Sequence, residues 1–204
     1  MIVFRDFTGA LWNIFIGNAL MVITIGFYIA WWVVLFRPDR SGPSPYGPPL
    51  IVIALVAGAA SIVFLIFGIS SQAWNGKDFP GAYFLLGALG AYVILLGITK
   101  SLFQRPVTSE LLLIVLWSTL EWSVITVLKM GDRLSSIQAL TLMVLLGLAA
   151  CIGLVCYVLF YRLDGTPRFW DGLIPLIVDG LVVITILGAL TFFSGPRGAP
   201  LNLR

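Results

Sequence analysis

Apolar residues form six long blocks along the chain, and the stretches between them are short and carry charges, proline or glycine. A helix needs about 20 apolar residues to cross a hydrocarbon core of about 30 Å, and every block reaches that length. Transmembrane strands would instead be about 10 residues long and alternate in polarity. Because lipid offers no partner for an unpaired backbone group, we predict that the blocks are helices. They cover residues 11–36, 50–73, 81–103, 110–129, 137–161 and 172–193.

Composition supports a membrane protein and excludes several other classes. Of the 204 residues, 60% are hydrophobic and 10% are charged, whereas a soluble domain is about 25% charged. The chain is too apolar for a disordered or nucleic-acid-binding protein, and its two cysteines are too few for a disulfide scaffold. We therefore predict an all-α polytopic membrane bundle with six transmembrane helices, folded as one domain over 1–204. Its partner would be the lipid bilayer of the plasma membrane, not a nucleic acid.

The two halves of the chain share landmarks in the same order. Residues 58–61 (GAAS) in the second block resemble 147–150 (GLAA) in the fifth, and Asn-Gly at 75–76 matches Asp-Gly at 164–165. Three helices per half would place the second half upside down in the membrane relative to the first. Inverted repeats of this kind recur in transporters, with the solute site near mid-membrane. Glycine, alanine and turn residues also recur by chance, so the sequence leaves a 3+3 inverted repeat open.

Glu121 is the strongest candidate for a functional side chain. It lies near the middle of the fourth block, where a carboxylate costs at least a few kcal/mol. It should therefore face a cavity or a partner, or carry a proton. Trp117 and Ser118 lie within one turn and would supply an aromatic wall and a hydroxyl group. The functional interpretation is a solute or proton site, and the alternative is a structural carboxyl that is hydrogen-bonded to a neighbouring helix.

Asp179, in the sixth block, is the second candidate. It follows Pro175 by four residues, so both side chains are expected on one face of the helix. Pro175 has no N–H for the carbonyl of Asp171, which predicts a kinked or broken helix. A helix break beside a buried carboxylate is typical of a discontinuous binding helix. A helix that packs against a glycine-rich neighbour would show the same pattern.

Polar and aromatic residues of the first block complete the candidate set. When the first and fourth blocks are aligned, Tyr28 corresponds to Glu121, which would place both at equivalent depths. Asn18 could line the site or hold helices together through a hydrogen bond. Trp32 lies close to Arg37, so we expect it in the aromatic belt at the membrane surface.

The absence of histidine restricts the chemistry. It excludes His-ligated haem, a His-based zinc site and catalysis by Ser-His or Cys-His pairs. A phosphate-binding glycine loop and a CxxC pair are also absent from the sequence. We therefore predict that the protein is not an enzyme and uses neither a cofactor nor a metal.

The sequence favours a small-solute channel or secondary transporter with a mid-membrane carboxylate site. The alternative is a structural or accessory subunit of a larger membrane complex, which short loops and glycine faces such as that of Gly87, Gly90 and Gly97 would suit. Such faces also suit a homo-oligomer. The residues assigned to the solute site are Glu121, Asp179, Tyr28, Trp117, Ser118 and Asn18, with a helix break at Pro175.

Overall fold

The structure is a bundle of six helices. It is a computed structural model that describes residues 9–37, 44–73, 81–103, 109–160, 162–163 and 166–192, and no strand occurs among them. The helices are α1 (Gly9–Phe36), α2 (Gly47–Ala73), α3 (Gly81–Phe103), α4 (Ser109–Met130), α5 (Ser136–Leu159) and α6 (Thr166–Phe192).

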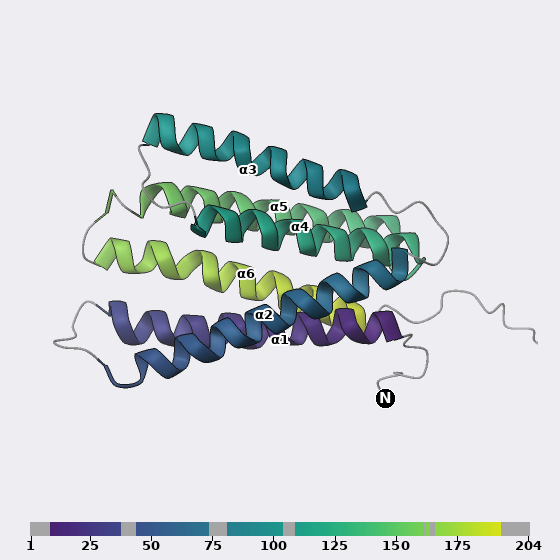
Figure 1. Ribbon diagram of the computed structural model, residues 1–204, viewed down its shortest axis with the longest axis horizontal. Helices are drawn as coiled ribbons and strands as arrows, with labels where there is room; N and C mark the ends of the chain where they lie inside the picture. Colours follow the sequence, from purple (N-terminus) through teal and green to yellow (C-terminus); the bar gives the residue numbers. More distant parts are fainter. Residues whose placement is uncertain are drawn as a thin grey trace, which may run out of the picture.

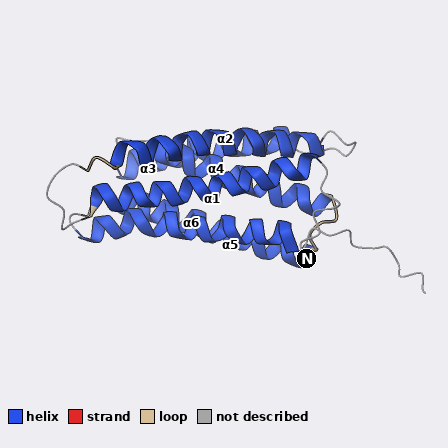
Figure 2. Cartoon of the chain, turned by 90° about the horizontal axis from the view of Figure 1, so that it is seen from below, coloured by secondary structure: helices blue, strands red, loops and turns tan. Residues whose placement is uncertain are grey.

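Consecutive helices run in opposite directions along the long axis of the molecule (Figure 1). In this view α3 lies at one edge of the bundle. Seen from below, α2 lies on one side and α5 and α6 lie on the other (Figure 2). Five helices are long and apolar enough to cross a membrane, and α3 has a shorter apolar stretch, Leu86–Ser101, among its described residues. The prediction of an all-helical, multi-pass membrane protein is confirmed.

The start of α6 differs most from the prediction. The charges and the proline of 162–171 predict a loop, but α6 begins at Thr166 instead of at 172. Pro167 suits the first turn of a helix, because its fixed φ is helical and no intrahelical bond needs its missing N–H. The early start brings Asp171 into α6, on the same face as Asp179.

The most extensive helix contact joins α1 and α2, and small residues make it close. A Cβ on Gly17 would lie 2.7 Å from Cγ of Leu65, and a Cβ on Gly68 would lie 2.9 Å from the backbone nitrogen of Ile14. The hydroxyl group of Ser61 donates a hydrogen bond of 2.7 Å to the carbonyl oxygen of Gly17. In lipid, helices associate through such close packing and hydrogen bonds. These contacts fix α2 against α1.

The most tightly packed part of the core occupies one half of the bundle. It is built from the N-terminal halves of α1 and α5 and the C-terminal halves of α2, α4 and α6, which antiparallel directions bring to the same end (Figure 1). The side chains that fill this half are almost completely buried. They include Leu11, Ile14, Leu65, Val124, Ile125, Leu128, Leu146, Val183, Ile186 and Leu190.

The inverted repeat stays a prediction. In the described residues α1 packs along α2 and α4 packs along α5, as a repeat requires. However, α5 also packs along α6, whereas contact between α2 and α3 is slight at most. The landmarks at 75–76 and 164–165 lie outside the described residues.

Candidate solute-binding site

A cavity of about 320 Å³ occupies the other half of the bundle. Five helices line it: α1 between Met21 and Trp32, α2 at Gly58 and Ile62, and segments of α4, α5 and α6. These segments are the C-terminal part of α5 and the N-terminal parts of α4 and α6, so the cavity lies at the end opposite the packed core. Its volume is at the small end of the range for ligand pockets, roughly 300–1,000 Å³.

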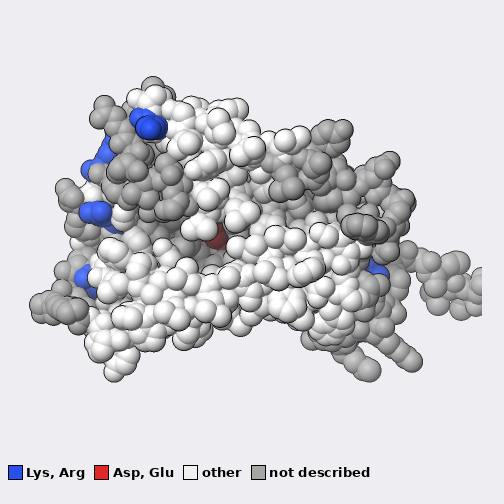
Figure 3. All heavy atoms as spheres, in the orientation of Figure 1, with Lys and Arg blue, Asp and Glu red and all other residues white. Residues whose placement is uncertain are grey.

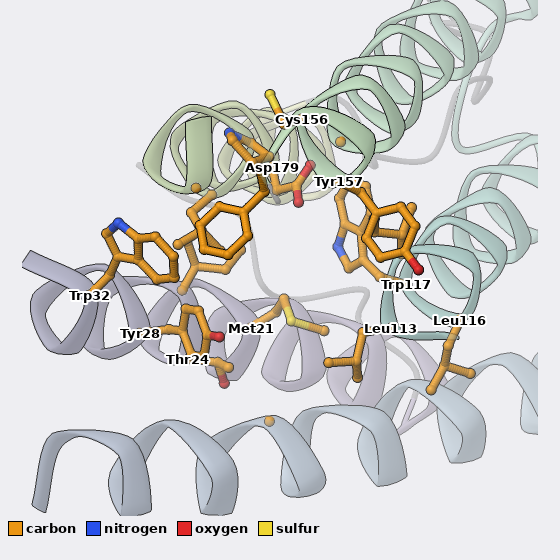
Figure 4. Close-up of a pocket in the computed structure, with 18 of the residues that line it drawn as sticks. Met21, Thr24, Tyr28, Trp32, Leu113, Leu116, Trp117, Cys156, Tyr157 and Asp179 are labelled. Carbon is orange, nitrogen blue, oxygen red and sulfur yellow. The ribbon is translucent and has the colours of Figure 1, made fainter. Parts of the chain in front are cut away.

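Two carboxyl groups of α6 reach this cavity. Asp179 is the fourteenth of the 27 residues of α6, near mid-membrane, and its carboxyl group points into the cavity (Figure 4). Asp171 lies eight residues earlier, or about 12 Å along the helix axis, and one of its oxygens is buried without a hydrogen-bond partner among the described residues.

Pro175 lies between these two carboxyl groups and also lines the cavity. The sequence predicts a helix break there, but α6 continues through Pro175 on both sides. A single missing backbone hydrogen bond is tolerated in transmembrane helices, where neighbouring helices support the chain. Because α6 is continuous, the spacing of four residues places Asp171, Pro175 and Asp179 along one face of the helix, and this face lines the cavity.

Aromatic rings form much of the cavity wall. Trp117 of α4 lies across the cavity from Tyr28 of α1 (Figure 4), and its indole N–H is buried without a hydrogen-bond partner among the described residues. Tyr157 of α5 and Phe160, the residue that follows α5, also line the cavity. Donors and acceptors are few, and the hydroxyl group of Thr24 already donates to the carbonyl oxygen of Leu20 at 2.8 Å. The wall therefore suits a solute that is mainly apolar better than a solute with many hydroxyl groups.

Trp32 lines the cavity near the C-terminal end of α1 (Figure 4). The sequence predicts that this residue lies at the membrane surface. The indole of Trp32 packs inside the bundle and is only 8% exposed, and its depth relative to the membrane surface stays a prediction. Its indole N–H donates a hydrogen bond of 3.1 Å to the carbonyl oxygen of Phe169, and its ring stacks on Phe36 with centroids 4.3 Å apart. The ring also lies against Gly172, which leaves no room for a Cβ. The absence of a side chain at Gly172 is what admits the indole between α1 and α6.

Three predicted site residues do not line the cavity. Glu121 is completely buried, and neither of its carboxyl oxygens has a hydrogen-bond partner among the described residues. It lies one turn beyond Trp117 on α4, where the cavity gives way to the packed core. Ser118 has a buried hydroxyl group without a partner in that set. Asn18 donates to the carbonyl oxygen of Ile14 in its own helix at 3.0 Å, not across helices.

The surface shows where the cavity opens. On the face shown in Figure 3, the described Lys and Arg side chains lie at the two ends of the bundle. An acidic side chain is visible at the bottom of a hollow near the middle of the same face. This view is perpendicular to the helices, so the hollow opens sideways. The cavity lining includes Gly58 and Ile62 of α2 and Leu113 and Leu116 of α4, two helices that contact each other only sparsely.

Sequence reasoning missed Asp171, Trp32 and Tyr157 as site residues. The signal for Asp171 was present in Thr166-Pro167, a pair that favours a helix start and would have placed Asp171 in the helix. The roles of Trp32 and Tyr157 depend on which helices are neighbours, and no local pattern reveals that.

The described residues contain no group of three His, Cys, Asp or Glu side chains that could hold a metal ion. Comparison with protein families, with curated proteins and with solved structures finds no match for this chain.

Proposed function

We propose that the protein is a small-solute transporter of the plasma membrane, with its binding site in the cavity and Asp179 as the central polar group. An aromatic-walled cavity with a few convergent polar groups is the usual form of a ligand site. An ionisable residue inside the membrane is costly and typically marks a solute or ion pathway. Asp179 replaces Glu121 as the proposed carboxyl group of the solute site, because Asp179 lines the cavity and Glu121 is completely buried outside it.

One observation carries this proposal: the cavity stops at mid-membrane. From Asp179 outward, one half of the described bundle contains the cavity, and the other half is filled by buried side chains such as Leu11, Leu65 and Ile186. A channel needs a path through both halves. A site confined to one half of the bundle, beside a packed opposite half, resembles one state of an alternating-access carrier.

A flux assay in liposomes tests the proposal. Purified protein is reconstituted, and the uptake of a panel of small neutral, acidic and basic solutes is compared with that of empty liposomes. We expect Asp179→Asn to change the rate for a transported solute at least tenfold. Asp132→Asn, the same change at an exposed turn residue, should leave the rate unchanged. Equal rates for wild type and Asp179→Asn across the panel would refute the role of Asp179.

A second candidate function is an accessory subunit of a membrane complex. The observation that favours it is on α3, where a Cβ on Gly87, Gly90 or Gly97 would meet no described atom within 4 Å. An uncovered glycine face permits close approach of a helix from another chain, including a second copy of this one. In this case Gly90→Leu would remove a co-purifying chain without affecting solute flux. Under the transporter proposal, flux would respond to Asp179→Asn whether or not a partner chain is present.

A further inference from the structure

We propose that the solute is a small lipophilic amine, an apolar body with a single ammonium group, which reaches Asp179 from the bilayer through the gap between α2 and α4. This inference rests on the proposed function, since it assigns the chemical class of the solute and its route to the same cavity.

The charge of the solute follows from the groups that face the cavity. Asp179 and Asp171 provide two carboxyl groups, and no lysine or arginine is among the described lining residues. A carboxylate in an apolar site is stabilised by an opposite charge, and an ammonium group provides one with three hydrogen-bond donors. An anionic solute would instead bring a third negative group into an apolar space. The carboxyl group of Asp179 points into the cavity (Figure 4), which leaves room for one such head group beside it.

The aromatic walls favour the same charge. A cation near the face of a tryptophan, tyrosine or phenylalanine ring is attracted by the ring, and the attraction grows when water is excluded. Tyr28, Trp117 and Tyr157 line the cavity with Asp179. One lining ring already shows this preference, because the guanidinium carbon of Arg168 lies 4.6 Å from the centroid of Phe160.

The body of the solute follows from the rest of the lining. The hydroxyl group of Thr24 is already used within its own helix, and most other lining residues, including Met21, Ile25 and Leu176, offer only apolar surface. A body with several polar groups would lose hydrogen bonds with water and find few replacements, at a cost of roughly 1–3 kcal/mol for each group left unpaired. An apolar or aromatic body makes no hydrogen bonds with water and therefore loses none on entering the cavity.

The route follows from the sideways opening. The hollow of Figure 3 is seen from a direction perpendicular to the helices, where a membrane protein faces lipid. Ile62 of α2 and Leu116 of α4 line the cavity on this side, and both are apolar. An amphiphilic amine partitions into the bilayer, so a lateral opening exposes the site to the phase in which the solute is most concentrated.

Three probes with nearly the same body test the head group: 4-phenylbutylamine, 4-phenylbutan-1-ol and 4-phenylbutyrate. Equilibrium dialysis compares nanodiscs that contain the full-length protein with empty nanodiscs, which corrects for partition into lipid. We expect the amine to bind at least tenfold more tightly than the alcohol and the butyrate to bind most weakly. Asp179→Asn should lower the affinity for the amine to that for the alcohol, and Asp132→Asn should not.

The outcomes separate this inference from the proposed function. Equal binding of the amine and the alcohol by the wild-type protein would overturn the amine assignment and needs no variant, so it does not depend on how Asp179→Asn folds. Flux of some other solute that Asp179→Asn alters would then leave the transporter proposal standing. If no panel solute moves and no probe binds, both proposals fail.

A matched pair of variants tests the route. Ile62→Trp narrows the gap between α2 and α4, whereas Val63→Trp adds the same side chain at a neighbouring residue that is 49% exposed. We expect Ile62→Trp to slow association of 4-phenylbutylamine about tenfold and Val63→Trp to leave it unchanged. Association rates that are equal in the two variants would overturn the lateral route.

Discussion

Gly172→Ala is expected to be one of the most destabilising small substitutions in the cavity wall. A Cβ at this residue would overlap Cζ2 of Trp32 and lie 2.5 Å from Cη2. A flexible side chain could move away, but this indole is buried, stacked on Phe36 and hydrogen-bonded to the carbonyl oxygen of Phe169. The added methyl group therefore forces the ring out of its site or separates α1 from α6.

The magnitude follows from two contributions. Overpacking a well-filled site costs about 1–3 kcal/mol, and loss of the hydrogen bond of Trp32 adds about 0.5–1.5 kcal/mol. The free energy of unfolding should thus fall by roughly 2–4 kcal/mol. Gly188→Ala is the matched control in the same helix, because a Cβ there meets no described atom within 4 Å. It should be neutral or stabilising by up to about 1 kcal/mol, through the higher helix propensity of alanine.

The assay is unfolding of the purified protein in mixed micelles with increasing sodium dodecyl sulfate, followed by far-UV circular dichroism. A double variant isolates the proposed overlap, because phenylalanine lacks the Cζ2 and Cη2 atoms that conflict with a Cβ on Gly172. Trp32→Phe combined with Gly172→Ala should cost less than the sum of the two single variants. The reasoning is refuted if Gly172→Ala and Gly188→Ala unfold at the same detergent fraction, or if the costs of the single variants simply add.

The same unfolding assay checks three more predictions. Gly68→Ala should lower stability by about 2–4 kcal/mol, because its Cβ would meet the backbone of α1, whereas Gly26→Ala, with open space around it, should not. Ser61→Ala should cost about 1 kcal/mol or less, since it removes the hydrogen bond to Gly17 but leaves the helix packing intact; a larger loss would show that the hydroxyl has a further role. Glu121→Met should raise stability by roughly 1–3 kcal/mol, because it replaces a buried carboxyl that has no partner among the described residues. A fall in stability of this last variant would show that Glu121 holds the bundle together.

Much of the fold was predictable, because a single local property decides it. A run of about 20 apolar residues excludes water, and the backbone must then pair within the helix. The ends of the helices were less predictable. Thr166-Pro167 starts α6 within a stretch whose charges predict a loop, since the fixed φ of proline outweighs the polarity of its neighbours at that point.

The candidate site was only partly predictable. Depth in the membrane can be counted along a helix, and that count selected Asp179, a residue that lines the cavity. The same count favoured Glu121, which is equally deep but faces the packed core. Counting along a helix gives depth, and depth alone does not say which face of the helix meets a cavity.

The sequence alone determined that the chain lies in lipid, that it folds into helices, and that acidic side chains occupy the middle of two of them. The tertiary structure decided which acid lines a cavity, because the crossing of α1, α2, α4, α5 and α6 leaves space around Asp179 and none around Glu121. The physical reason is that burial in lipid is a property of each helix by itself, whereas a cavity exists only where the side chains of several helices fail to fill the space between them.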